Sequence, residues 1–347
     1  MAVRLNAGAI LVIGPSWVGD MMMAQSLFKV IKQRSPHFSI DVLAPSWSGP
    51  LLRHMPEIRQ AIELPVGHGT LALGLRRRLA RSLLGAGYQQ AIVLPNSFKS
   101  ALIPWWARIP RRTGYLGELR YGLLNDRRAV DAQRLPRTVE RYVALGLEPE
   151  EPFPDHYPLP RLEVDATLAT ATLSQFGLPR GDQPVLALCP GAAYGPAKRW
   201  PAPYFGAVAK AMLDQGWGVW VLGSDADRTS AAAVCDAAGS RCVDLAGRTT
   251  LEQTIDLLQR ADAVVTNDSG LMHVAAGLNR RVVAIYGSSD PAFTPPLSPL
   301  SRVEHLGLSC SPCFARECRF GHTRCLTDLL PDRVIEALQR VLAHMTD

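Results

Sequence analysis

Short apolar runs alternate with helix-like segments along this chain, and the alternation occurs twice. In the first half the apolar runs lie at 9–14, 40–43, 60–64 and 91–94, with helix-like segments at 21–34, 75–84 and 97–106. In the second half they lie at 185–189, 218–222, 242–245, 263–266 and 282–286, with helix-like segments at 203–215, 226–238 and 251–260. This alternation is typical of parallel sheets covered by helices. It predicts an α/β fold with two doubly wound, Rossmann-like halves and a cleft between them.

The alternation lapses from 125 to 180, where the sequence is rich in Arg and Pro. Such a composition is typical of a connection between domains. We expect an N-terminal domain over 1–165 and a C-terminal domain over 166–330, followed by a helical segment within 331–347. A chain of 347 residues with 47% hydrophobic and 20% charged residues can fill two such cores and is too apolar to be disordered.

Pro, Gly, Asp or Arg interrupts every apolar stretch before it reaches the roughly 20 residues that a membrane-spanning helix needs. The run at 9–13 has no clear small-residue cleavage site after it, so it indicates a core strand rather than a signal peptide. We therefore expect a cytoplasmic protein.

Positive charge is concentrated in one part of the chain. The segment 76–128 holds eleven basic residues and two acidic ones. This excess predicts attraction to an anionic partner, although a solvated basic face is an equal alternative. No recognition helix or aromatic stacking platform accompanies the cluster, so nucleic acid is not an expected partner.

Ligands of open α/β sheets bind beyond the carboxyl ends of the strands, so the residues after each apolar run are the candidates. After the first run, Gly14 and Gly19 allow a tight turn, and Asp20 stands at the start of a helix. Its carboxylate is suited to act as a general base facing the cleft, or to cap the helix. The glycine spacing does not match a dinucleotide fingerprint, which disfavours a dehydrogenase.

In the second half, a loop of small and basic residues occupies 190–201. Gly191 and Ala192 let backbone N–H groups approach phosphates, and Lys198 supplies positive charge without a metal ion. A plain surface loop is the alternative. Asp225 follows the run at 218–222, where a carboxylate accepts hydrogen bonds from ribose hydroxyls or caps the next helix.

The segment 267–273 links a buried strand to a helix. There Asp268 is suited to bind sugar hydroxyls, while the N–H groups of Ser269 and Gly270 are suited to meet a phosphate. His273 is equally compatible with a ligand contact and with packing in the core. The segment therefore predicts a nucleotide or sugar-nucleotide site.

Four segments together resemble the bacterial heptosyltransferases of glycosyltransferase family 9. They are the Ser-Trp-Val-Gly-Asp-Met sequence at 16–21, 190–192 with 198–201, 267–273, and the Cys-Ser-Pro-Cys sequence at 310–313. The similarity runs nearly end to end. It implies a GT-B fold of two Rossmann-like domains facing across a cleft, with the C-terminal helix of 331–347 returning to the first domain. It also implies inverting, metal-independent transfer of L-glycero-D-manno-heptose from ADP-heptose to the first heptose of the lipopolysaccharide inner core, with no cofactor.

The resemblance also implies roles for individual residues. Asp20 matches the family's catalytic base, Lys198 its diphosphate-binding lysine, and Asp268 the residue that holds the heptose hydroxyls. Asp225 matches a ribose-binding position at which the family often carries Glu, so the shorter side chain departs from the pattern. Together with the strand-end argument, this gives the expected donor-binding residues: Gly191, Ala192, Lys198, Asp225, Asn267, Asp268, Ser269, Gly270 and His273.

The acceptor implied by the resemblance is a phosphorylated, lipid-linked inner-core saccharide. It fits the basic excess of the first half, and we expect Asn96, Lys99, Arg111 and Arg112 to contact it. Because no anchor is present, we expect peripheral contact with the inner face of the inner membrane.

Cys310, Cys313, Cys318 and Cys325 form a C-x2-C-x4-C-x6-C cluster that also contains His322. The spacing allows a structural zinc site, but only one close Cys pair is present, and reduced thiols are the alternative. We expect no metal in the active site itself.

Two other functions remain open. One is a related GT-B transferase with another heptose acceptor position or another nucleotide sugar. The other is a non-catalytic nucleotide-sugar binding protein, which would not need a carboxylate at the position of Asp20.

Overall fold

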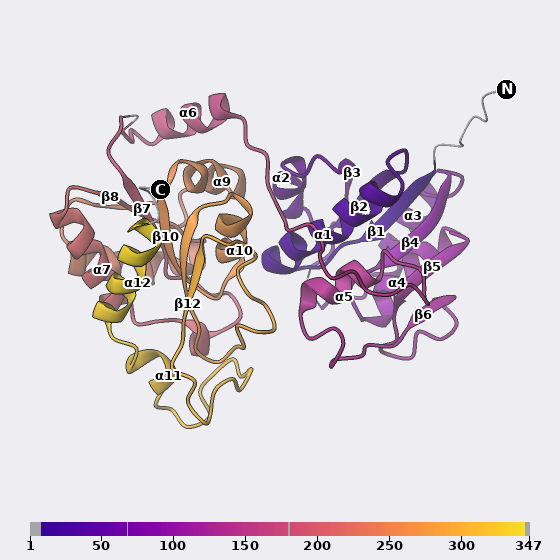
Figure 1. Cartoon of the computed structure of the whole chain (residues 1–347). Coiled ribbons are helices and arrows are strands. Elements are labelled where there is room, and N and C mark those ends of the chain that lie inside the picture. Colours follow the sequence, from indigo (N-terminus) through magenta and orange to yellow (C-terminus); the bar gives the residue numbers. More distant parts are fainter. Residues whose placement is uncertain (1–7, 68, 180, 344–347) are drawn as a thin grey trace. The chain divides into compact units, whose positions relative to one another are not determined.

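The computed structural model describes residues 8–67, 69–179 and 181–343. The chain divides into two compact units, Met1–Pro160 and Arg161–Asp347 (Figure 1). Each contains a six-stranded sheet with helices packed against it. The predicted α/β class with two doubly wound halves is confirmed. The division falls within the Pro-rich stretch, between Pro160 and Arg161, whereas the sequence analysis places it after 165.

The first unit is a parallel sheet with the strand order β3-β2-β1-β4-β5-β6. Its strands are β1 (Ala9–Ile13), β2 (Ser39–Ala44), β3 (Ile58–Glu63), β4 (Tyr88–Val93), β5 (Arg111–Tyr115) and β6 (Asp126–Arg128). Its helices are α1 (Val18–Arg34), α2 (Ser48–Arg53), α3 (Leu73–Ser82), α4 (Phe98–Trp106) and α5 (Thr138–Ala144).

The central strand β1 is buried along its whole length, because its apolar side chains face helices on both sides of the sheet. Helix α1 is buried from Met21 to Phe28, and α5 packs against it. Both ends of the β1–α1 turn are thereby held firmly, which fixes the residues that follow β1.

The second unit repeats this topology, with the strand order β12-β11-β10-β7-β8-β9. Its strands are β7 (Val185–Cys189), β8 (Gly218–Val221), β9 (Cys242–Asp244), β10 (Ala263–Asn267), β11 (Arg281–Ile285) and β12 (Ser301–Glu304). Its helices are α6 (Ala166–Gln175), α7 (Ala202–Asp214), α8 (Arg228–Ala238), α9 (Leu251–Arg260), α10 (Gly270–Gly277), α11 (Arg324–Thr327) and α12 (Pro331–Ala343), with short 3₁₀ turns η1 (Pro196–Lys198) and η2 (Asp225–Asp227).

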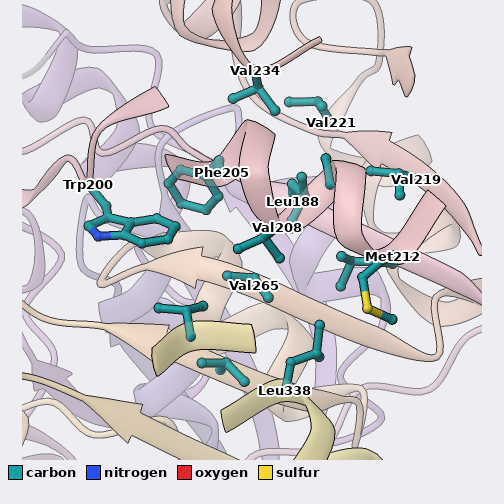
Figure 2. Close-up of a cluster of buried hydrophobic side chains, with 14 of the residues drawn as sticks. Leu188, Trp200, Phe205, Val208, Met212, Val219, Val221, Val234, Val265 and Leu338 are labelled. Carbon is teal, nitrogen blue, oxygen red and sulfur yellow. The ribbon is translucent and has the colours of Figure 1, made fainter. Parts of the chain in front are cut away.

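The core of the second unit is built around Trp200 and Phe205, whose rings meet edge to face at 4.9 Å between centroids. Leu188 of β7 and Val265 of β10 belong to the same cluster (Figure 2). So does Leu338 of α12. Helix α12 therefore packs within the second unit, against α7 and β11.

The return of the C-terminal helix to the first domain, which the resemblance implies, stays a prediction. The apolar stripe of α12, Val334, Ala337 and Leu338, is used to close the core of its own unit. Residues 344–347, which the expectation included, lie outside the described part of the chain.

In each sheet the strand order reverses direction at one place, between β1 and β4 in the first unit and between β7 and β10 in the second. Loops after neighbouring strands diverge there to opposite faces of the sheet, which leaves a crevice at the carboxyl ends of the strands. Of the helices that the structure describes, none is long and apolar enough to cross a membrane.

Candidate functional site

The first unit has a pocket of about 1200 Å³ at the carboxyl ends of β1 to β4. Its walls come from the β1–α1 turn, the β2–α2 turn, loop 64–71 after β3, and the β4–α4 turn. Asp20, Asn96 and Lys99 all line it. The structure thus brings the predicted base together with two of the four predicted acceptor contacts.

Asp20 is the third residue of α1, and the N-cap position is occupied by Trp17. Asp20 is therefore not the N-cap residue itself, and its carboxylate in the first turn interacts favourably with the helix dipole. Tyr142 of α5 lines the same pocket. Burial, with the negative charge of Asp20 adding to it, holds the pKa of Tyr142 well above its ordinary range. The phenol therefore stays protonated at neutral pH.

Aromatic side chains also line the pocket. Trp17, Trp47 and Phe98 come from three different strand-end turns. Trp17 and Phe98 are 40% and 43% exposed, which is unusual for such large apolar groups. Faces of this kind are suited to stack on sugar rings, whose C–H groups are apolar. The rule of inspecting the residues after each strand would have found Trp47, which follows β2.

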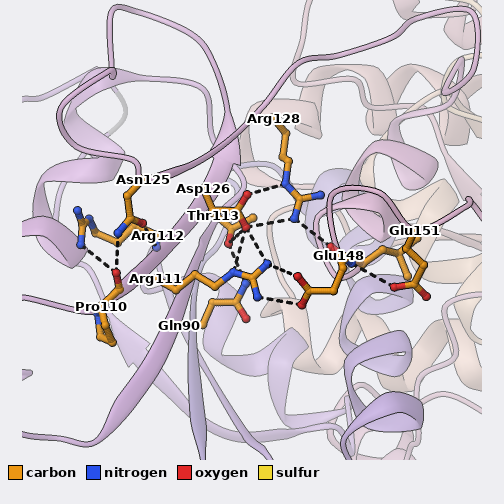
Figure 3. A network of polar contacts seen from close by, with 11 residues as sticks. Gln90, Pro110, Arg111, Arg112, Thr113, Asn125, Asp126, Arg128, Glu148 and Glu151 are labelled. Atoms are coloured by element: carbon orange, nitrogen blue, oxygen red, sulfur yellow. Dashed lines mark hydrogen bonds and ion pairs between the residues drawn. The ribbon is translucent and has the colours of Figure 1, made fainter.

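Arg111 and Arg112, the other two expected acceptor contacts, lie apart from this pocket. They begin β5, and Arg111 pairs in register with Gln90 near the start of β4, so both lie toward the amino-terminal edge of the sheet. The guanidinium of Arg111 bonds Glu148 at 2.8 and 2.9 Å and Asp126 at 3.0 Å (Figure 3). Arg112 donates to the backbone oxygens of Leu123 and Ile109. Both residues hold the fold together at this edge.

In the second unit, the loops after β7 and β10 meet through an ion pair. Nζ of Lys198 lies 2.5 Å from Oδ2 of Asp268, and the Ser289 hydroxyl donates to the same oxygen at 2.5 Å. The side chains of Asp268 and Lys198 are only 5% and 18% exposed. Ser289 follows β11, so the strand-end rule would also have found it. The pair presents a cation and an acceptor side by side at the carboxyl edge of the sheet.

Asn267 was expected at the donor site. Its side-chain amide hydrogen-bonds to both ends of the 190–200 loop. Its Nδ2 donates to the Pro190 carbonyl at 2.7 Å, and its Oδ1 accepts from the Trp200 N–H at 3.0 Å. The residue is fully buried. Asn267 is therefore a positioning residue that fixes the loop carrying Lys198.

Gly191 lies against a buried carboxylate. A Cβ at this position would lie 2.4 to 2.5 Å from the carboxyl group of Asp227, so only glycine fits there. Asp227 in turn accepts hydrogen bonds from the backbone N–H and the hydroxyl of Ser224. Ala192 beside it is buried, and its carbonyl accepts from Arg199 at 3.3 Å. The loop is thus held close to the β8–η2 turn.

Asp225 occupies a different environment from Asp227. Its side chain is 85% exposed and pairs with Arg228 at 2.7 Å. An exposed carboxylate after β8 remains available to a ribose, so its predicted role is neither supported nor opposed by its position. Asp227 was missed by the sequence analysis, because a second Asp two residues later gives no separate signal.

Helix α10 begins at Gly270, with Ser269 as its N-cap. The first N–H groups of a helix lack acceptors within the helix, so this end of α10 is suited to an anion. His273, one turn further, is buried, and burial lowers its pKa to about 4. It is therefore neutral at pH 7, and the positive charge at this edge comes from Lys198.

The four cysteines from 310 to 325 and His322 surround a small cavity in the second unit. Burial and the neighbouring thiols raise the pKa of Cys325. Across residues 8–67, 69–179 and 181–343, no group of three or more His, Cys, Asp or Glu side chains is arranged to hold a metal ion.

Comparison with known proteins gives consistent matches over nearly the whole chain. The family model "Glycosyltransferase family 9 (heptosyltransferase)" matches residues 76–324. Lipopolysaccharide heptosyltransferase 2 of Escherichia coli K12 is 46% identical over 342 residues, covering 96% of this chain and 98% of that protein. Lipooligosaccharide heptosyltransferase 2 of Haemophilus influenzae is 44% identical over 346 residues, covering 96% and 99%.

Solved structures match as well. The E. coli ADP-heptose LPS heptosyltransferase II superimposes with a TM-score of 0.87 at 44% identity, covering 98% of this chain and all of that one. A glycosyl transferase family 9 protein from Veillonella parvula gives a TM-score of 0.81 at 20% identity, covering 99% of each chain. The latter shows the shared fold.

Proposed function

Because this chain belongs to glycosyltransferase family 9, we propose that it is an inverting, metal-independent transferase that moves L-glycero-D-manno-heptose from ADP-heptose to the first heptose of the lipopolysaccharide inner core. Heptose transfer in lipopolysaccharide core biosynthesis is its activity, as in relatives that are 46% and 47% identical. The stereochemistry, the donor nucleotide and the roles of individual residues are the proposal.

The observation that carries the proposal is the position of Asp20. Asp20 lines a pocket large enough for a saccharide, and aromatic side chains and Lys99 line the same pocket. A sugar hydroxyl is a poor nucleophile at neutral pH, and a nearby carboxylate that accepts its proton during attack makes it a better one. Asp20 is then the general base for the acceptor hydroxyl.

The donor is assigned to the second unit. The N-terminal end of α10 and the Nζ of Lys198 donate hydrogen bonds to the diphosphate, and Asp268 accepts hydrogen bonds from the heptose hydroxyls. Attack on the anomeric carbon from the face opposite the diphosphate inverts the configuration. The bond to the diphosphate oxygen breaks, and ADP leaves with the electron pair.

Charge on the diphosphate grows as the glycosidic bond breaks through an oxocarbenium-like transition state. Lys198 and the N–H groups at Ser269 and Gly270 therefore interact more strongly with departing ADP than with intact donor. That difference is what lowers the barrier. A fixed cation at this position supplies the charge that a divalent ion supplies in other transferases, which supports a metal-independent reaction.

Incubation of the chain with ADP-heptose and a truncated acceptor ending in the first inner-core heptose tests this proposal. We expect the acceptor to gain one heptose with the anomeric configuration opposite to that in the donor, and we expect EDTA to leave the rate unchanged. Product mass, linkage analysis and the configuration at the new bond are the measurements.

The same assay separates the alternatives. Transfer from a UDP-sugar, or to another position of the acceptor, would indicate a related transferase. Binding of ADP-heptose with no transfer to any acceptor would indicate a nucleotide-sugar binding protein. Because the acceptor is lipid-linked, we also propose peripheral contact of the chain with the membrane that carries it.

A further inference from the structure

The loop between β5 and β6 carries an apolar tip. Leu116, Leu119 and Tyr121 are 41%, 81% and 58% exposed. Leu119 and the preceding Glu118 have φ angles of 56° and 43°, a left-handed conformation that L-residues other than Gly, Asn and Asp rarely adopt. Clustered exposed apolar groups on a surface loop mark an interaction site more often than chance exposure.

The loop is fixed to the pocket of the first unit rather than free to move. Arg120, at its centre, is fully buried, and its guanidinium donates to the backbone oxygens of Pro95 (2.7 Å) and Tyr115. The Glu118 carboxylate accepts from the Phe98 N–H at 2.7 Å. Since Phe98 and Glu118 both line the pocket, the apolar tip is held beside it.

Guanidinium groups occupy the same region of the unit. Helix α3 packs against α4, and the exposed cations of the region are Arg77, Arg78 and Arg81 on α3 and Arg127 on β6. Within the part of the chain that the structure describes, none of these four pairs with a carboxylate. Arg127 donates to the backbone oxygen of Tyr121 at 3.4 Å, which places one cation directly beside the tip.

The two acidic residues of the segment 76–128 do not neutralise these exposed arginines. Glu118 is held by the Phe98 N–H, and Asp126 is bonded by Arg111 and Arg128. The surface therefore combines projecting apolar side chains with unneutralised positive charge. This combination is complementary to a bilayer of anionic lipids, whose headgroups attract guanidinium groups and whose interface accepts Leu and Tyr side chains.

We propose that the surface made by Leu116, Leu119 and Tyr121 together with Arg77, Arg78, Arg81 and Arg127 docks onto an anionic membrane. It places the adjacent pocket at the membrane surface, where a lipid-linked acceptor enters it. This inference rests on the proposed function for the identity of the acceptor, but the docking itself does not depend on catalysis.

The test is co-sedimentation of the full chain with vesicles of phosphatidylethanolamine and phosphatidylglycerol, with phosphatidylcholine vesicles as the neutral comparison. The double variant Leu119→Asn, Tyr121→Ser removes the apolar tip, and Asn tolerates the left-handed backbone at 119. Leu168→Asn is the matched control, since Leu168 is 50% exposed on α6 in the other unit. We expect the double variant to bind anionic vesicles about tenfold more weakly and the control to bind as the wild type does.

A second variant tests the charge. Changing Arg77, Arg78 and Arg81 to Gln should weaken binding to anionic vesicles by about tenfold or more and make it less sensitive to salt. Equal binding by the double variant and the wild type, or no binding of the wild type to anionic vesicles, would overturn the proposal. Loss of self-association in the double variant without a change in vesicle binding would overturn it too, and would assign the surface to a second copy of the chain.

Turnover of a deacylated, water-soluble acceptor separates this inference from the proposed function. We expect the double variant to keep that turnover within about twofold while losing turnover of the same acceptor embedded in vesicles. Equal loss on both acceptors would place the loop in the acceptor site and contradict membrane docking. If the wild type transfers no heptose at all, vesicle binding still decides the docking inference by itself.

Discussion

Lys198 and Asp268 form a nearly buried ion pair, with 2.5 Å between Nζ and Oδ2, at the point where the loops after β7 and β10 meet. Neither residue acts alone. The pair compensates two charges that are largely removed from water, so deletion of one partner leaves the other with an uncompensated charge. Lys198 is assigned to the diphosphate of the donor and Asp268 to its heptose. Substitutions of the two residues should therefore have unequal effects on ADP binding.

We expect Lys198→Ala to weaken ADP binding by about tenfold or more, because it removes a cation and leaves the Asp268 carboxylate to repel the diphosphate. Asp268→Asn should affect ADP less, since ADP carries no heptose for it to hold. Isothermal titration with ADP measures both. Lys210→Ala, at an exposed position on α7, is the matched control. Unchanged ADP affinity in Lys198→Ala would remove Lys198 from the diphosphate site.

Asn267 provides a test of loop positioning. Asn267→Ala leaves the Pro190 carbonyl and the Trp200 N–H without their buried partners. We expect the free energy of unfolding to fall by about 2–6 kcal/mol, at roughly 1–3 kcal/mol for each of the two buried groups left unpaired. ADP affinity should fall as well, because the loop that carries Lys198 loses its anchor. Urea unfolding and ADP titration check the two effects, and stability within error of wild type would contradict the positioning role.

The parts of the fold that the sequence predicted are those with strong local signals. The buried strands β1, β4, β7 and β10 are short apolar runs bounded by turns, and all four were expected at these places. Strand β5, which lies beside β6, and the edge strands β6 and β12 were not expected. Their sequences, Arg-Arg-Thr-Gly-Tyr, Asp-Arg-Arg and Ser-Arg-Val-Glu, are too polar or too short to give a strand signal. Their place is decided by pairing with a neighbouring strand.

The missing β5 explains why Arg111 and Arg112 were grouped with Lys99. Without that strand, the two residues appear to follow α4 as part of a basic loop near Lys99. The pairing of Arg111 with Gln90 shows that they begin a strand, at the edge away from the residues that follow β4. By contrast, Asp20, Asn96 and Lys99 directly follow predicted strands, and the strand-end rule was sufficient to group them.

His273 predicts a pH dependence of stability. Burial lowers its folded-state pKa to about 4, below the ordinary value of 6.5. The unfolded chain therefore binds a proton more readily, and stability falls as pH decreases from 6.5 toward 4, with no effect above 6.5. Through this histidine, acidification from pH 7 to pH 5 should lower the free energy of unfolding by roughly 2 kcal/mol.

Urea unfolding of wild type and His273→Gln at both pH values isolates this effect, because other titrating groups contribute to both proteins. The wild type should lose more stability than the variant on acidification. An equal loss in the two proteins would show that His273 is not the buried neutral group described above.

Two other ionisable groups in the pocket of the first unit serve as controls for the base. Glu118 accepts the Phe98 N–H, and Tyr142 is held protonated by burial and by the charge of Asp20. We expect Glu118→Gln and Tyr142→Phe to retain turnover within about tenfold of wild type, because neither group accepts the proton in the proposed reaction. Turnover with ADP-heptose over a range of pH measures this. A loss as large as that in an Asp20 variant would reassign the base.

The central claim is that Asp20 removes the proton from the acceptor hydroxyl while the second unit binds the nucleotide. The most direct measurement is turnover with ADP-heptose and the truncated acceptor for Asp20→Asn, together with ADP affinity by titration. Asn keeps the size of the side chain at the third position of α1 but is not a base. We predict that turnover falls by roughly 100-fold or more while ADP affinity stays within about threefold. Near-normal turnover in Asp20→Asn would contradict the account.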